Sequence, residues 1–175
     1  MNKLIEKVRK LSIMSKFILV LLFLIPSVWW LFGAGYFMMH DDLQVMRIFE
    51  IWRCFRDGQI PCRWSPDMSF GYGQAMFNFY SAFPYYLGLI YKLIFSASFI
   101  GSAKFLFAAS LIIAGFGMFF LAKELWGYLG GIVSAVLYTY APYHAVDVYI
   151  RGALAESFGL AIIPWVWLFS YKVIK

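Results

Sequence analysis

The feature that most constrains this chain is an uncharged run of apolar residues from Phe17 to Met39. A helix of about 20 residues suffices to cross the hydrocarbon core of a bilayer, so this run predicts a spanning helix. Basic residues gather before it, as is typical of the cytoplasmic flank of a span: Lys3, Lys7, Arg9, Lys10 and Lys16. We therefore expect residues 1–16 to form a cytoplasmic basic helix, and His40 to emerge at the outer face of the cell membrane.

The composition places the whole chain in the membrane class. Apolar residues make up 63% of the chain and aromatic residues 22%, whereas soluble domains are roughly 45–50% apolar. The basic residues fall into separate groups, so the sequence offers no basic face for nucleic acid. We expect an all-α integral membrane protein, a multi-spanning helical bundle with flat juxtamembrane amphipathic helices. We interpret it as the front part of a longer protein.

Three further apolar runs predict spanning helices over residues 104–122, 125–143 and 157–172. The charged pair Lys123 and Glu124 separates the first two, and we expect the chain to reverse there on the cytoplasmic side. Glycines in the second run, with Gly131 among them, favour close helix packing.

The stretch Met76–Ala103 decides the topology. If it crosses the membrane, the polar residues 144–156 lie on the opposite side from Asp41. If it lies flat, both acidic clusters share the outer face. Its interruption by Pro84, Gly88 and Lys92 favours the flat arrangement. We therefore expect residues 40–103 to form a first external loop and residues 144–156 a second.

Residues 41–58 predict an amphipathic helix that begins the first external loop. Asp41 followed by Gln44 fits a capping box, and Gly58 fits the stop. The apolar face comprises Val45, Ile48, Phe49, Trp52 and Phe55, and the opposite, solvated face comprises Arg47, Glu50, Arg53 and Asp57.

Cys54 and Cys62 lie within this loop. Their spacing allows a small disulfide loop in an oxidising compartment. Two unpaired, partly buried thiols are the alternative, which we favour.

Several segments together resemble the N-terminal part of the GT-C superfamily, which are multi-spanning glycosyltransferases that use polyprenyl-phosphate sugars. One feature of the resemblance is the acidic pair that follows the first predicted span. The segments themselves are Asp57–Trp64, Gly71–Gln74, Phe77–Leu87, Tyr140–His144 and Tyr149–Glu156. The chain is most similar to large bacterial and archaeal proteins named "membrane protein 6-pyruvoyl-tetrahydropterin synthase-related". It has no zinc-binding set of histidines that this name would imply.

The resemblance implies a catalytic Asp41 in the first external loop and a second acid, Glu156, in the second. Arg151 or Arg63 is then our candidate partner for the phosphate, because a guanidinium group matches phosphate geometry. Gln74 stands near a position where some relatives carry a substrate-contacting lysine. Expected partners are membrane lipid and a polyprenyl-phosphate sugar donor.

A divalent cation, Mg or Mn, between Asp41, Asp42 and Glu156 would fit the preference of hard cations for carboxylate oxygens.

Each of these residues also has a structural interpretation. Asp41 can serve only as a helix cap, and Glu156 with Arg151 can form a local ion pair. His40 fits a solvated interfacial position, and His144 a hydrogen-bonding position at a helix end. The alternative function is therefore a non-catalytic membrane protein, such as a transporter piece or an assembly factor. We expect the 175 residues by themselves to be inactive.

Overall fold

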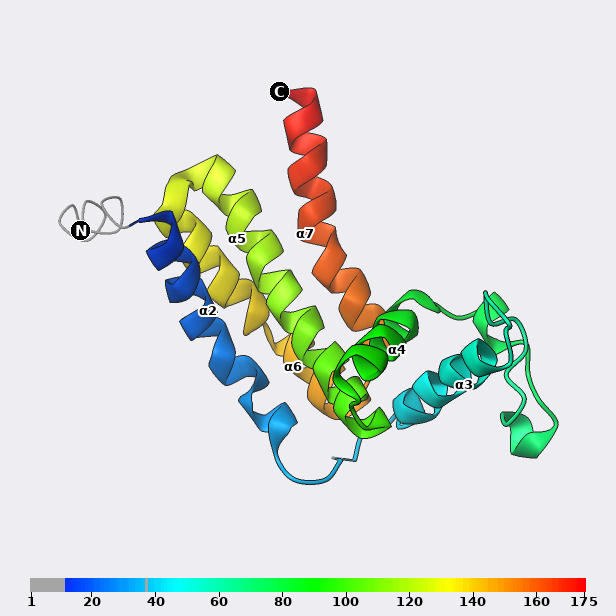
Figure 1. The fold of residues 1–175 in the computed structure, drawn as a ribbon. Coiled ribbons are helices and arrows are strands. Elements are labelled where there is room, and N and C mark those ends of the chain that lie inside the picture. The colour runs from blue at the N-terminus through cyan, green and yellow to red at the C-terminus, as the bar shows by residue number, and fades with distance from the viewer. Residues whose placement is uncertain (1–11, 37) are drawn as a thin grey trace.

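The computed structural model describes residues 12–36 and 38–175, and these residues are helical apart from loops and one isolated antiparallel bridge between Ser65 and Gln74. The elements in chain order (Figure 1) are α2 (Ile13–Trp29), η1 (Trp30–Phe32), α3 (Gln44–Arg56), η2 (Ser69–Gly71), η3 (Met76–Asn78), α4 (Phe83–Phe95), α5 (Phe99–Thr139), α6 (Pro142–Val146), the π-helical turn η4 (Asp147–Arg151) and α7 (Leu154–Ile174).

Within the described residues, three segments are helical, long and apolar enough to cross a membrane: Met14–Phe32, Phe99–Thr139 and Leu154–Ile174. This supports a helical membrane bundle. The first segment ends seven residues before the predicted Met39. Gly33 follows it in an extended conformation, with ψ 168°, and its carbonyl accepts a hydrogen bond of 2.6 Å from the buried Lys104 side chain. The predicted basic helix over residues 1–16 lies mostly outside the described residues.

The 41 residues of α5 form two arms rather than one rod. A straight helix of that length would extend about 60 Å at 1.5 Å per residue, twice the roughly 30 Å hydrocarbon core. At Gly127 the backbone leaves the helical conformation, with φ 76° and ψ −176°, and the chain turns back on itself (Figure 1). The reversal therefore lies at Gly127, a few residues beyond the expected Lys123–Glu124 turn.

The two arms of α5 pack closely at glycines. A Cβ atom added to Gly115 would lie 2.7 Å from the Thr139 hydroxyl, and one added to Gly131 would lie 2.8 Å from the Phe119 carbonyl oxygen. The close packing expected at Gly131 is therefore present. Helices α2 and α7 both pack on α5, and the Ser110 and Ser157 hydroxyls share a buried hydrogen bond of 2.7 Å between α5 and α7.

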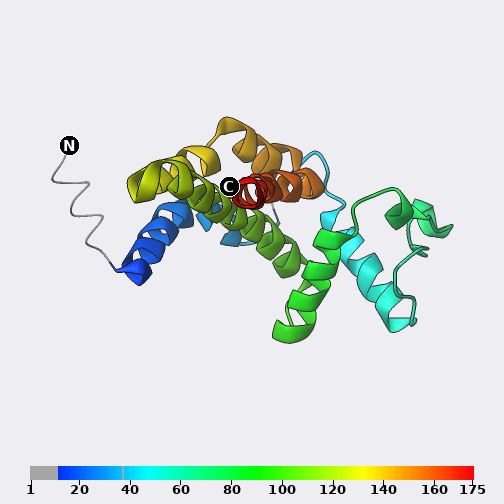
Figure 2. The same ribbon diagram turned by 90° about the horizontal axis from the view of Figure 1, so that it is seen from above.

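The stretch Met76–Ala103 contains no helix long enough to span. Its helix α4 has 13 residues, about 20 Å at 1.5 Å per residue, and ends at Ser96 in the left-handed conformation. Helix α4 packs on α3 and α5. Figure 2 shows α3 and the loop that follows it to one side of the bundle formed by α2, α5 and α7.

Helix α3 departs from its predicted faces. Arg47 and Glu50, which we expected on the solvated side, are 8% and 0% exposed, whereas Phe55 from the expected apolar face is 42% exposed. Leu43 is the N-cap and makes no side-chain capping bond, so the capping box at Asp41 is wrong. The predicted stop agrees with the structure, since Gly58 follows the helix with φ 73°.

Cys54 at the end of α3 forms a disulfide with Cys62. The expectation of two unpaired thiols is therefore wrong. The two Cα atoms lie 5.4 Å apart, a usual separation for a bridged pair, because the loop after α3 folds back along the end of the helix. The bridge ties the start of this long loop to α3.

Candidate functional site

The two acidic segments of the chain meet at one end of the bundle. The backbone amide of His40 donates to the Ile150 carbonyl at 3.0 Å, and that of Asp41 donates to the Arg151 carbonyl at 2.8 Å. These bonds place the residues that follow the first span directly against the π-helical turn η4. The sequence expectation that both acidic clusters share one face of the bundle agrees with this contact.

Gly152 makes the contact between these segments sterically feasible. It ends η4 with φ 67°, a left-handed conformation that costs little only for glycine. A side chain there would also overlap its neighbours, because an added Cβ would lie 2.2 Å from the Met39 sulfur and 2.9 Å from the Asp41 carbonyl oxygen. The glycine thus fixes where Asp41 passes over η4.

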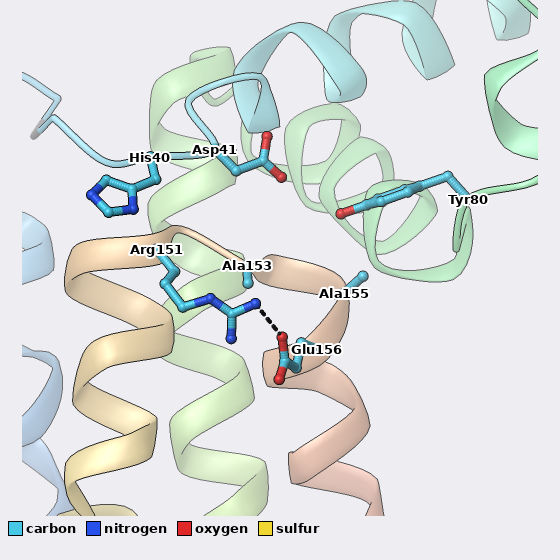
Figure 3. A pocket seen from close by; sticks show the side chains of 7 residues that line it. All are labelled: His40, Asp41, Tyr80, Arg151, Ala153, Ala155 and Glu156. Atoms are coloured by element: carbon cyan, nitrogen blue, oxygen red, sulfur yellow. Dashed lines mark ion pairs between the residues drawn. The ribbon is translucent and has the colours of Figure 1, made fainter.

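A cavity of about 510 Å³ opens where these segments meet. Asp41, Arg151 and Glu156, three of the residues proposed from the sequence, all line it. Figure 3 shows the Asp41 carboxyl group and the Tyr80 hydroxyl pointing toward each other, with the Arg151–Glu156 pair across from them. The full lining comprises His40, Asp41, Tyr80, Arg151, Ala153, Ala155 and Glu156.

Asp41 is held by two side chains of α3. Its Oδ2 atom accepts hydrogen bonds from Gln44 Nε2 at 2.9 Å and from Arg47 Nη1 at 2.7 Å. The side chain remains 31% exposed. Both of these bonds go to Oδ2, and neither goes to Oδ1. Asp41 is therefore a fixed carboxylate at a cavity rather than a helix cap.

A buried polar network stands behind Asp41. Gln44 Nε2 also donates to the Gly152 carbonyl at 2.7 Å, and Gln44 Oε1 accepts from the Tyr85 hydroxyl at 2.6 Å. The Arg47 guanidinium lies 4.3 Å from the centre of the Tyr80 ring, a cation–π distance. Burial raises the pKa of the Tyr85 hydroxyl, so Tyr85 remains a hydrogen-bond donor at neutral pH.

Arg151 sits between two carboxylates on the other side of the cavity. Its Nη2 pairs with Glu156 Oε2 at 2.8 Å and its Nη1 with Asp147 Oδ1 at 2.7 Å. The Tyr143 hydroxyl donates to Glu156 Oε1. The turn of η4 and the first turn of α7 thus hold Glu156 and Arg151 in a defined arrangement.

Asp147 is a buried member of this group. Its side chain is 0% exposed and Oδ2 has no hydrogen-bond partner among the described residues. Burial, and secondarily the Glu156 carboxylate, raise the pKa of Asp147 to about 6. Nearby, His144 is buried and neither ring nitrogen has a partner within the described part of the chain, contrary to its expected hydrogen-bonding role. Burial lowers the pKa of His144.

Other residues proposed from the sequence lie outside the cavity. Arg63 and Asp42 are exposed and are not among its lining residues, and Gln74 lines a second cavity instead. Over residues 12–36 and 38–175, no three His, Cys, Asp or Glu side chains group closely enough to hold a metal ion. Asp41, Asp42 and Glu156 are therefore not grouped as a metal site in the described residues, and binding of Mg or Mn stays a prediction.

The sequence-based prediction missed Gln44, Arg47, Tyr80 and Tyr85. A helical pattern was present that could have found the first two. The buried side chains of α3 are spaced three or four residues from one another along one face: Gln44, Arg47, Ile48, Glu50, Ile51 and Cys54. A polar side chain on the same stripe as buried apolar ones indicates a buried partner. No sequence pattern pairs Tyr80 or Tyr85 with α3, since they come from the loop and α4.

Comparison with known proteins gives no match to a family model, to a curated protein or to a solved structure.

Proposed function

We propose that the chain is the N-terminal part of a GT-C-like glycosyltransferase. Such an enzyme would transfer a sugar from a polyprenyl-phosphate donor on the external side of the cell membrane. One observation carries the proposal: Asp41 is distant in the sequence from the neighbouring residues Arg151 and Glu156, and yet all three line a single cavity. The motif resemblance implied Asp41 and Glu156 as the two acids, and guanidinium chemistry made Arg151 or Arg63 the candidate partner for the phosphate. The three apolar helices support the membrane setting that a lipid-linked donor requires.

The proposed reaction needs a base more than an acid. The acceptor hydroxyl oxygen forms a new bond to the anomeric carbon, while the bond from that carbon to the phosphate oxygen breaks. Polyprenyl phosphate leaves with the electron pair of the broken bond, and the hydroxyl proton passes to Asp41, the general base. Arg47 and Gln44 orient the Asp41 carboxylate. Arg151 holds Glu156 and supplies positive charge near the departing phosphate.

Asp41→Asn in the protein at its full natural length tests this assignment. We expect transfer from a radiolabelled polyprenyl-phosphate sugar to fall about 100-fold or more, the usual contribution of a general base. Asp42→Asn is the matched control, because the adjacent side chain is exposed and does not line the cavity. It should keep transfer within about twofold of the wild type.

Equal activity of the Asp41→Asn and Asp42→Asn proteins would refute the base assignment. Glu156→Gln should also reduce transfer, because Glu156 lines the cavity and pairs with Arg151. Full transfer by both the Asp41 and Glu156 variants would remove this cavity from the reaction.

One observation favours the alternative of a non-catalytic membrane protein. Each acid of the cavity already has a basic partner, Asp41 with Arg47 and Glu156 with Arg151. Such pairs could serve only to join the segment after the first span to η4. In that case Asp41→Asn would lower the thermal unfolding midpoint, and wild-type membranes would show no sugar transfer.

A further inference from the structure

A second cavity of about 300 Å³ shares Tyr80 with the first. Tyr80 lines both cavities, whereas Asp41, Arg151 and Glu156 line only the first. The second cavity lies between the start of α3 and the loop that contains η2 and η3. Its lining comprises Leu43, Arg47, Met68, Gln74, Met76, Phe79 and Tyr80.

The chemistry of the second cavity differs from that of the first. The first contains two carboxylates beside Arg151. In the second, Arg47 is the one charged residue among the lining residues, all of which the structure describes, and four of the others are apolar. Ligand sites typically combine a mostly apolar wall with a few placed polar groups. The lining therefore suits a molecule with one anionic group and an apolar part.

Arg47 has donors left for such an anion. A guanidinium carries five N–H donors, and the bonds of Arg47 to Asp41, Tyr80 and Tyr85 all leave from Nη1. Its Nε is buried and has no hydrogen-bond partner within the described residues. Folded chains rarely leave a buried donor without an acceptor. A phosphate group can supply the missing acceptor, because its oxygens accept two parallel hydrogen bonds from a guanidinium group.

The edge of the cavity indicates where the ligand comes from. Phe79 is 90% exposed and Leu43 is 46% exposed, although both line the cavity. Nearby in the same loop, Phe70 is fully exposed and Tyr72 is 87% exposed. Exposed aromatic side chains are typical of the membrane–water interface. A ligand that enters between such side chains would come from the bilayer rather than from water.

We propose that this second cavity binds the phosphate headgroup of a membrane lipid, with the phosphate at Arg47 and the adjoining apolar atoms against Leu43, Met76 and Phe79. The binding does not require sugar transfer, so it can hold or fail independently of the proposed activity. Gln74, which stands near a position where members of the resembling family carry a substrate-contacting lysine, lines this second cavity and not the first.

Native mass spectrometry of the purified chain in neutral-detergent micelles tests this proposal. Phosphatidic acid should bind with one lipid retained per chain, and phosphatidylcholine with the same acyl chains should bind at least about tenfold more weakly. Inorganic phosphate should not displace the bound lipid. Equal retention of the two lipids would overturn the assignment of an anion site, and tight binding of inorganic phosphate alone would overturn the lipid source.

Gln74→Glu locates the site. It places a negative charge in the cavity lining at an exposed side chain, so the fold should be kept. Like-charge repulsion at about 10 Å with an effective dielectric constant of about 20 corresponds to roughly a tenfold loss of phosphatidic acid affinity. Asn78→Asp is the control, since Asn78 is also exposed and lies in the same loop but does not line the cavity. Equal affinities of the two variants would place the lipid elsewhere and refute the proposal.

Discussion

Gly152 is where a single added methyl group should test the whole arrangement of the site. Its φ of 67° belongs to the left-handed region, and an added Cβ would lie 2.2 Å from the sulfur and 2.7 Å from Cγ of Met39. It would also lie 2.9 Å from the Asp41 carbonyl oxygen. The Asp41 backbone cannot easily retreat, because its amide is bonded to the Arg151 carbonyl.

The expected cost of Gly152→Ala follows from two terms. A non-glycine residue in the left-handed conformation costs roughly 1–2 kcal/mol. Forcing an extra methyl group into a packed contact typically costs about 1–3 kcal/mol. We therefore expect the free energy of unfolding to fall by about 2–5 kcal/mol. Part of the second term should return in the double variant Met39→Ala with Gly152→Ala, because the nearest atoms belong to the Met39 side chain.

Reversible unfolding in mixed micelles, titrated with sodium dodecyl sulfate and followed by circular dichroism, measures this change. Gly159→Ala in α7 is the matched control, because its added Cβ meets no atom within 4 Å apart from its chain neighbours and the backbone of its own helix. Alanine is the better helix former by about 1 kcal/mol, so this variant should be slightly more stable. If Gly152→Ala were as stable as Gly159→Ala, the contact of the segment after the first span with η4 would be wrong.

Two further predictions concern a buried acid and the disulfide. The pKa of Asp147, raised from 3.8 to about 6 by burial, means that the folded state binds its proton more tightly than the unfolded chain. The free energy of unfolding should therefore fall by up to about 3 kcal/mol as pH rises from about 4 to about 6. Asp147→Asn should make this fall smaller in denaturant titrations at pH 4.5, 5.5 and 7. The same dependence of stability on pH in the variant and the wild type would contradict the prediction. Replacing Cys54 and Cys62 by serine should lower the free energy of unfolding by about 2.5 kcal/mol. The disulfide closes a loop with a sequence separation of 8, and its loss restores the entropy of that loop in the unfolded chain. An unchanged denaturation midpoint under oxidising conditions would show that the bridge does not form.

The class of fold could be predicted from the sequence, because long uncharged runs have few stable conformations other than helices that can cross a membrane. The end of the first span could not. The run stays apolar to Met39, but its last residues lie outside the helix. There the Gly33 carbonyl accepts a hydrogen bond from Lys104, a contact between distant segments that apolar composition does not indicate. The position of the reversal could not be predicted either. We expected it at Lys123 because charged residues stand there, but the chain reverses at Gly127, the nearest glycine.

The sequence allowed the carboxylates of the candidate site to be predicted, but not the side chains that hold them in place. Asp41 and Glu156 stand out as carboxylates beside apolar runs, where charge is costly. The faces of α3 were misassigned because Arg47 and Glu50 were taken as solvated on polarity alone. Arg47 is buried by partners from other segments, Asp41 and the tyrosines of the loop and α4. Such partners depend on tertiary contacts that one helix does not encode.

The bond between Gln44 and the Gly152 carbonyl sets an order of events during synthesis. The two residues are 108 positions apart, and ribosomes add roughly 5–20 residues per second. For at least about 5 seconds after Gln44 is made, its partner does not yet exist. Asp41 and Arg47 can pair early, but the cavity cannot close until η4 and the start of α7 have been translated. The site is thus completed late, after the hairpin of α5 has been synthesised.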